Sequence, residues 1–141
     1  MQDPVLMYWA RVERCLEALD SCRNEAAVDA IFAELSCVEN VYQRAVPTTA
    51  AGIRRKIADA IVTLETSRER EDELWRRWCT KLRTIDRRLA KGALLPRDVF
   101  NLRAIYQAEM AQNCEDDFLP LIRTALRGAC TPKLIYESAA T

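Results

Sequence analysis

The fold class is decided by the stretch DPVLMYWARVERCLEALD, residues 3–20. Asp3 is a favourable N-cap, and Pro4 suits the first helical position because its missing N–H is not needed there. Apolar residues then recur at alternating spacings of four and three, which places them on one face of a helix. They are Val5, Trp9, Val12, Leu16 and Leu19. The stretch therefore predicts an amphipathic helix that packs against another helix.

A second stripe of the same kind follows directly. Asn24 is a suitable N-cap, and Pro47 closes the segment, so a helix is predicted up to about Val46. Its apolar positions are Val28, Ile31, Phe32, Leu35, Val38 and Tyr42. Because the link at residues 21–24 is short, the first two helices are expected to form an antiparallel hairpin.

A third helix is predicted after Thr48 or Thr49, and its far end is open to two interpretations. Its stripe stops at Leu64, and a wholly polar run, TSREREDE, occupies residues 66–73 before the stripe resumes at Leu74. Without an intervening Gly or Pro, the pattern favours one long central helix from about residue 50 to 91. The alternative is a break near Thr66, which has the spacing of a capping box with Glu69.

The remaining helices are shorter. Lys91 and Gly92 form a strong helix stop, since glycine tolerates the left-handed conformation found there. One further helix is expected to open at Pro96 or Asp98, and a last one to be capped by Asp116 or Asp117 and stopped by Gly128. The chain has only three glycines in 141 residues, which also favours helix. We therefore expect an all-α bundle of five or six helices, with one domain at 1–129 and a tail at 130–141.

The formal net charge of the chain is zero, but acidic and basic residues are unevenly distributed along the sequence. Residues 1–46 carry eight acids and four bases, whereas residues 76–103 carry nine bases and two acids. The basic segment indicates either an acidic partner or packing beside the acidic parts of the chain's own fold. The sequence shows neither a signal peptide nor a membrane-spanning apolar run, so a cytoplasmic location is expected.

The residue types limit the chemistry. The sequence contains no histidine, which excludes an imidazole base and histidine metal ligands. Its acidic pairs, such as Glu13 and Glu17, are typical of solvated helix faces. The cysteines show no Cys-x-x-Cys pair and are expected to be free, mostly buried thiols. They are Cys15, Cys22, Cys37, Cys79, Cys114 and Cys130. We predict no catalytic residue, no metal and no cofactor.

The most unusual local feature is a pair of tryptophans followed by a basic run. Trp75 and Trp78 share one helix face. The candidate partner-binding residues are Trp75, Arg76, Arg77, Trp78, Lys81, Arg83, Arg87 and Arg88. Exposed indoles and bases would suit nucleic acid. The competing interpretation places both tryptophans in the core and the arginines on the solvated side of the helix.

The segment from Pro47 to Lys56, PTTAAGIRRK, carries a resemblance. It is similar to a Thr-x-x-Ala-Gly-Ile/Leu-x-x-Lys segment of short, uncharacterised helical proteins from alphaproteobacterial genomes and prophages. There, too, the segment starts a helix after an acidic helical pair. The resemblance implies no activity. Physically, the free N–H groups near Thr48 and Thr49 could hold an anion beside the following bases.

These features favour a non-enzymatic helical interaction protein, a small bacterial or phage-encoded regulator or adaptor. Its expected partner is another protein or a second copy of the chain, since heptad-like stripes favour a homo-oligomer. The alternative is a nucleic-acid-binding helical protein that uses the basic segment 76–103. No membrane partner is expected.

Overall fold

The computed structural model describes residues 2–66, 73–111 and 118–131, and within those residues the regular secondary structure is helical. The elements are α1 (Pro4–Ser21), α2 (Glu25–Arg44), α3 (Ala50–Thr66), α4 (Glu73–Ala90), α5 (Pro96–Ala111) and α6 (Phe118–Ala129). The predicted all-α bundle of five or six helices is confirmed. In the described ranges, no helix is long and apolar enough to cross a membrane.

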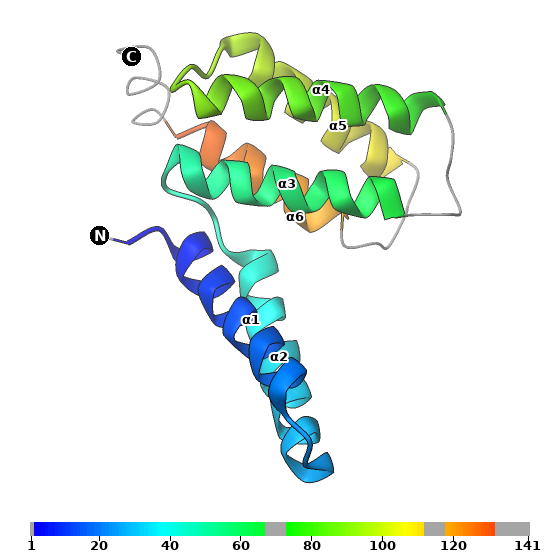
Figure 1. Ribbon diagram of the computed structural model, residues 1–141. Coiled ribbons are helices and arrows are strands. Elements are labelled where there is room, and N and C mark those ends of the chain that lie inside the picture. Colours follow the sequence, from blue (N-terminus) through cyan, green and yellow to red (C-terminus); the bar gives the residue numbers. More distant parts are fainter. Residues whose placement is uncertain (1, 67–72, 112–117, 132–141) are drawn as a thin grey trace.

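The helices form two parts with different surroundings (Figure 1). Helices α3 to α6 pack into a bundle, here called the body. Helices α1 and α2 form an antiparallel pair, here called the hairpin, which meets the body at α3 and α6 and projects away from it. The expected N-terminal hairpin is thus confirmed, and most of its length has no other helix beside it in the described structure.

Local signals set the starts of α1 and α2 and the end of α4 as the sequence predicts, whereas α2 ends at Arg44 and not near Val46. The Asp3 carboxylate accepts a hydrogen bond from Val5 N, and Pro4 is the first residue of α1. Asn24 accepts from the first turn of α2 in the same way. Gly92 has a φ of 74°, and its N–H donates to Leu89 O, which ends α4 at a left-handed residue. These ends depend on neighbours only a few residues away.

The predicted long central helix is wrong. Helix α3 ends at Thr66, and α4 packs back against it. Arg54 Nε lies 2.9 Å from Asp86 Oδ1, 32 residues further along the chain. In one continuous helix those residues would be about 48 Å apart. The chain turns because Ile57 of α3 and Leu82 of α4, both fully buried, contribute to one core, which a continuous helix cannot achieve.

Three remaining predictions concern the C-terminal region. The proposed cap at Asp116 or Asp117 lies outside the described residues, as does the tail beyond Thr131. Gly128 does not stop α6, which continues to Ala129. Instead, a Cβ at Gly128 would lie 2.5 Å from Pro47 Cγ, so glycine there permits close packing of α6 on the α2–α3 connection.

The described cysteines are free thiols, as expected, but fewer are buried than the sequence predicts. Cys15 and Cys79 are buried, whereas Cys37 and Cys130 are exposed. Burial raises the pKa of the Cys79 thiol, so it behaves as a small apolar residue of the core. Cys114 lies outside the described residues.

Candidate functional site

The tryptophan pair belongs to the core, which corrects its place in the candidate partner-binding set. Trp75 is 3% exposed and Trp78 is 5% exposed. Both rings stack on Phe118 of α6, with centroid separations of 6.2 Å. Because their faces are covered by α6, the indoles cannot stack on nucleic-acid bases or anchor a partner. Their i, i+3 spacing places both on the stripe that α4 buries.

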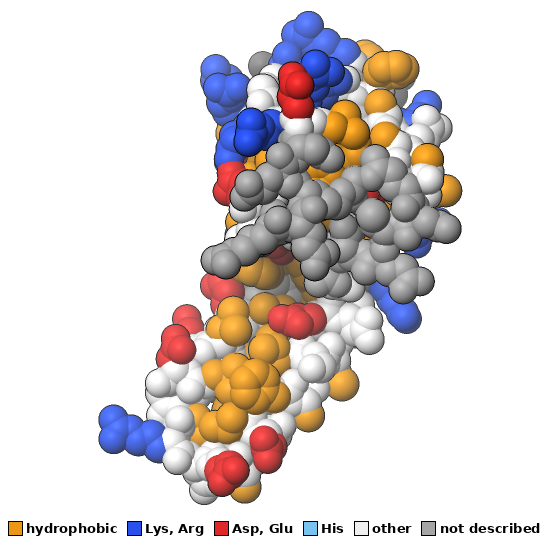
Figure 2. Space-filling model, turned by 90° about the vertical axis from the view of Figure 1, so that its right-hand side faces the viewer, with side chains coloured by type: hydrophobic (Ala, Val, Ile, Leu, Met, Phe, Trp, Pro, Cys, Tyr) orange, Lys and Arg blue, Asp and Glu red, His pale blue; other side chains and the backbone are white. Residues whose placement is uncertain are grey.

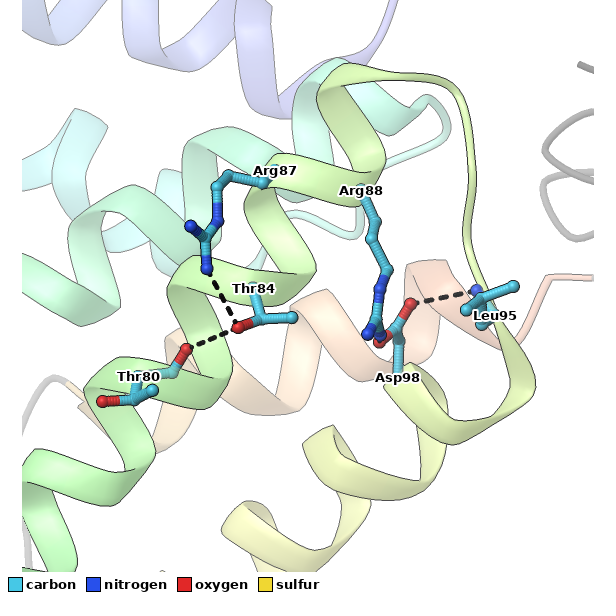
Figure 3. Close-up of polar contacts among 6 residues, drawn as sticks. All are labelled: Thr80, Thr84, Arg87, Arg88, Leu95 and Asp98. Atoms are coloured by element: carbon cyan, nitrogen blue, oxygen red, sulfur yellow. Dashed lines mark hydrogen bonds and ion pairs between the residues drawn. The ribbon is translucent and has the colours of Figure 1, made fainter.

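The candidate basic residues divide into paired and unpaired groups. Arg83 pairs with Glu65 across the α3–α4 interface, and Arg77 lies 3.3 Å from Glu73 on its own helix. Figure 3 shows Arg87 lying along α4 toward Thr84, whose hydroxyl accepts from the guanidinium at 3.3 Å. Arg76 and Lys81 are exposed, and no ion pair within the described ranges involves either of them.

Arg88 links α4 to α5 within the body. Its guanidinium turns toward Asp98, a fully buried carboxylate in the first turn of α5 (Figure 3). The same carboxylate accepts from Leu95 N at 3.0 Å, which caps the start of α5. A buried carboxylate needs this compensation, because an unpaired buried charge is costly. Part of the basic segment's charge is therefore used inside the fold, and Arg88 is removed from the candidate surface.

The anion expected near Thr48 and Thr49 is supplied by the chain itself. Asp3 Oδ2 accepts hydrogen bonds from Thr48 N at 3.1 Å, Thr49 N at 2.9 Å and Thr49 Oγ1 at 2.6 Å. Its other oxygen caps α1. One carboxylate, 3% exposed, thus closes the N-terminal ends of α1 and α3 together. An external anion cannot occupy the same N–H groups, so the expected anion site is withdrawn.

The base of the hairpin is joined to α3 by a cluster of polar and aromatic side chains. Lys56 Nζ donates to the carbonyls of Tyr42 and Gln43, which lie in the last turn of α2. The Tyr42 hydroxyl donates to Asp59 Oδ2 at 2.5 Å, and Arg55 Nη2 donates to Asp59 Oδ1 at 2.8 Å. These contacts join the C-terminal end of α2 to α3.

Lys56 is the most perturbed base in this cluster. It is 0% exposed, and desolvation by burial lowers its pKa to about 8, against the smaller opposite effects of Asp59 and Asp3. Lysines with lowered pKa serve as amine nucleophiles in some enzymes. Here, however, Nζ is enclosed and bonded to two main-chain carbonyls, so its geometry is that of a helix C-cap.

The hairpin leaves apolar side chains exposed that the sequence stripes assign to its core. Leu16 of α1 is 44% exposed and Phe32 of α2 is 53% exposed. The contact between the two helices buries Val12, Cys15, Leu35 and Val38, with Trp9, Leu19 and Ile31 partly buried against them. Leu16 lies four residues after Val12, and Phe32 lies three residues before Leu35. At these helical spacings, each exposed side chain is a surface neighbour of a buried one and lies at the edge of the contact between α1 and α2.

A groove of about 220 Å³ lies where this side of the hairpin meets the body. Its lining includes Trp9, Val12 and Tyr42 from the hairpin and Val62 and Leu121 from the body. Since Leu16 is seven residues from Trp9, it continues the same side of α1 toward the hairpin tip. We call the surface made by Leu16, Phe32 and this groove, which includes Trp9 and Val12, the hairpin face. Figure 2 looks onto the hairpin from this side, where hydrophobic side chains run along it, with acidic side chains at the edges and a Lys or Arg side chain projecting near the tip.

The acids at the hairpin face are largely uncompensated. Glu39 lines the groove, while helical spacing places Glu13 next to Trp9 and Asp20 next to Leu16. All three are exposed, and in the described part of the chain none of them forms an ion pair. Asp59, by contrast, is paired with Arg55, whose guanidinium lies 4.2 Å from the Trp9 ring centroid. The hairpin face is therefore apolar at its centre and negative at its margin.

Sequence reasoning placed the candidate site on α4 and assigned Leu16 and Phe32 to the core. The sequence feature that could have indicated their exposure is the width of the two apolar stripes. Helices α1 and α2 carry more apolar positions than two helices packed on each other can cover. Within the described residues, no group of three metal-ligand side chains comes together. Comparison with known protein families, curated proteins and solved structures finds no match to this chain.

Proposed function

We propose that this chain is a non-enzymatic helical interaction protein whose α1–α2 hairpin binds a protein partner. In line with the resemblance of its Thr48–Lys56 segment, we take it to be a small bacterial or phage-encoded regulator or adaptor. The observation that carries the proposal is the exposure of Leu16 and Phe32 beside a groove on a projecting hairpin. Contiguous apolar surface with a polar margin is typical of interaction sites.

The energetic argument concerns the two exposed side chains. Phe32 is 53% exposed and Leu16 is 44% exposed, so a partner that covers them removes apolar surface from water. Each gains on the order of 1–2 kcal/mol if it becomes fully buried. The flanking groove provides a concave site in which an anchoring side chain of the partner can be desolvated. A rigid helical pair also presents this surface at low entropic cost.

A second candidate function is nucleic-acid binding through the outward side of α4. Arg76, Lys81 and Arg87 are exposed, and the first two lack an ion pair to the described residues. Exposed bases along one helix can contact successive phosphates. The burial of Trp75 and Trp78 removes the stacking component, so binding by this route would depend on charge alone and fall steeply with added salt.

A pull-down from the host organism tests both functions together. The full chain serves as bait in lysates with and without nuclease, beside two Phe→Ser variants. Phe32 lies on the hairpin face, and Phe100, 68% exposed on α5, is the matched control. We expect proteins retained by the wild type and by Phe100→Ser to be lost with Phe32→Ser, whatever the nuclease treatment.

Other outcomes assign a different function. Retention that nuclease abolishes, and that the Arg76→Glu, Lys81→Glu, Arg87→Glu variant also abolishes, supports nucleic-acid binding instead. Equal retention by both phenylalanine variants contradicts a hairpin site. A homo-oligomer remains a further prediction, and light scattering of the wild type across concentrations tests it. A strict monomer at all concentrations excludes it.

A further inference from the structure

The acidic margin of the hairpin face limits what kind of partner fits it. We propose that the hairpin face binds a basic amphipathic helix of another protein. This inference rests on the proposed function and adds the chemistry of the partner. It follows from the shape of the face, from the charges around it and from a comparison of the helices available to cover it.

The shape suits a helix. The face runs along α1 from the groove at Trp9 to Leu16, seven residues or two turns away, and it is bounded on the other side by α2. A third helix laid on a pair of antiparallel helices buries an apolar stripe against both of them. Its side chains at positions i, i+3 or i+4, and i+7 would reach Leu16, Phe32 and the groove.

The charged residues around the hairpin face indicate that the partner helix is positively charged. Glu13 and Asp20 of α1 and Glu39 of α2 lie around the face without ion pairs to the described residues. The arginines Arg11 and Arg14 line a separate groove together with Cys15 and Glu34. By helical spacing, that groove lies on the opposite side of the hairpin. A helix with lysines or arginines flanking its apolar stripe therefore meets the unpaired acids along the margin, while Arg55, the base beside Trp9, is already paired with Asp59.

A second copy of the chain is a poorer occupant. A two-fold contact of the hairpin face with itself brings the two sets of unpaired acids together, which is repulsive. The chain's own basic helix is also unsuitable, because the outward side of α4 carries arginines, lysine and threonines while Trp78, Leu82 and Ile85 are buried. It has the charge that the face requires but not the apolar stripe.

Three designed peptides test the proposal on the full chain. Each is about 18 residues long, roughly 27 Å as a helix, and carries a fluorescent label. The first has leucines at i, i+3, i+7, i+10 and i+14 with lysine and arginine between them. The second replaces each base by glutamate. The third has the composition of the first in a scrambled order that removes the apolar stripe. Fluorescence anisotropy gives the Kd for each.

We expect the basic amphipathic peptide to bind at least about 10-fold more tightly than the glutamate and scrambled peptides. Phe32→Ser should weaken that binding about 10-fold, whereas Phe100→Ser should change it less than about 2-fold. Glu39→Lys should weaken it several-fold and flatten its salt dependence, because it reverses one charge at the margin. Both phenylalanines are exposed, so the variants are expected to fold.

The proposal is overturned if the basic peptide does not bind, if the scrambled peptide binds equally, or if Phe32→Ser leaves the Kd unchanged. It is also overturned if light scattering shows a dimer of the wild type that Phe32→Ser dissociates, because the occupant is then a second copy. None of these results alone removes the proposed function. That function fails separately, if the host-lysate pull-down gives the same retained proteins for Phe32→Ser and Phe100→Ser.

Discussion

Gly52→Ala is expected to destabilise the protein by about 2–3 kcal/mol, although alanine is the better helix former by about 1 kcal/mol. The reason is the carboxylate that closes the ends of α1 and α3. A Cβ at Gly52 would lie 2.1 Å from Asp3 Oδ2 and 2.7 Å from its Cγ. To make room, the carboxylate must leave Thr48 N, Thr49 N and Thr49 Oγ1, and these partly buried donors lose their acceptor.

A double-mutant cycle isolates this contact. Asp3→Ala alone should cost about 3 kcal/mol, because it removes the cap of α1 and the acceptor at the start of α3. In the Asp3→Ala background, Gly52→Ala should become neutral or stabilising by up to about 1 kcal/mol, since only the helix propensity remains. The free energies of unfolding come from urea denaturation of the four proteins.

The sign change is the discriminating result. A coupling of at least about 2 kcal/mol means that Gly52 is required because of Asp3. If the two changes are additive, Gly52 is required for another reason, and the junction of the two helix ends described above is wrong.

Lys56→Met is expected to destabilise the protein by about 2 kcal/mol at pH 7. Methionine fills a similar volume, but it leaves the carbonyls of Tyr42 and Gln43 without their donor at the end of α2. The loss is partly offset because a buried ammonium no longer has to be desolvated. The change in the free energy of unfolding therefore gives the stabilisation from the two hydrogen bonds at the end of α2 minus the cost of burying the ammonium group.

The stability lost in Lys56→Met is expected to increase as the pH rises. The folded lysine loses its proton near pH 8, whereas the ordinary value is 10.5. Between those values the unfolded state binds more protons, so raising the pH stabilises the folded wild type. The deficit of Lys56→Met should therefore grow by about 2 kcal/mol between pH 7 and 9.5. Measurements stay below pH 10, because the raised pKa of Tyr42 destabilises the folded state above that pH.

Lys81→Met provides the matched control, since Lys81 is exposed on α4. It should change the free energy of unfolding by less than about 0.5 kcal/mol at either pH. A Lys56→Met deficit that shrinks or stays constant as the pH rises would show that burial does not lower the pKa of Lys56.

The parts of the fold that depend on local contacts follow from the sequence. Asp3 and Pro4, Asn24 and Gly92 are recognisable because a cap involves residues within one turn. The turn between α3 and α4 has a single local signal, the capping-box spacing of Thr66 and Glu69, and α3 does end at Thr66. Its polar segment contains neither Gly nor Pro, and the chain turns only because Ile57 and Leu82 share a core that neither half can form alone.

Contacts between distant residues explain what the sequence analysis missed at the candidate site. Thr49 is 46 residues from Asp3, so the bases near Thr49 suggested an external anion where the chain supplies its own. Likewise, a stripe identifies apolar positions but not how many helices are available to cover them. For this reason Leu16 and Phe32 were indistinguishable from core residues until the hairpin was seen to project from the body.

Site-specific photo-crosslinking in the host cell tests the central claim, that a protein partner binds on the hairpin face. A photoreactive phenylalanine analogue replaces Phe32 on the hairpin face, Phe100 on α5 or Arg87 on α4, all three exposed. We predict a protein adduct from position 32 that positions 100 and 87 do not give. Adducts from position 87 or 100 in the absence of one from position 32 would contradict the claim and place the interaction on the body.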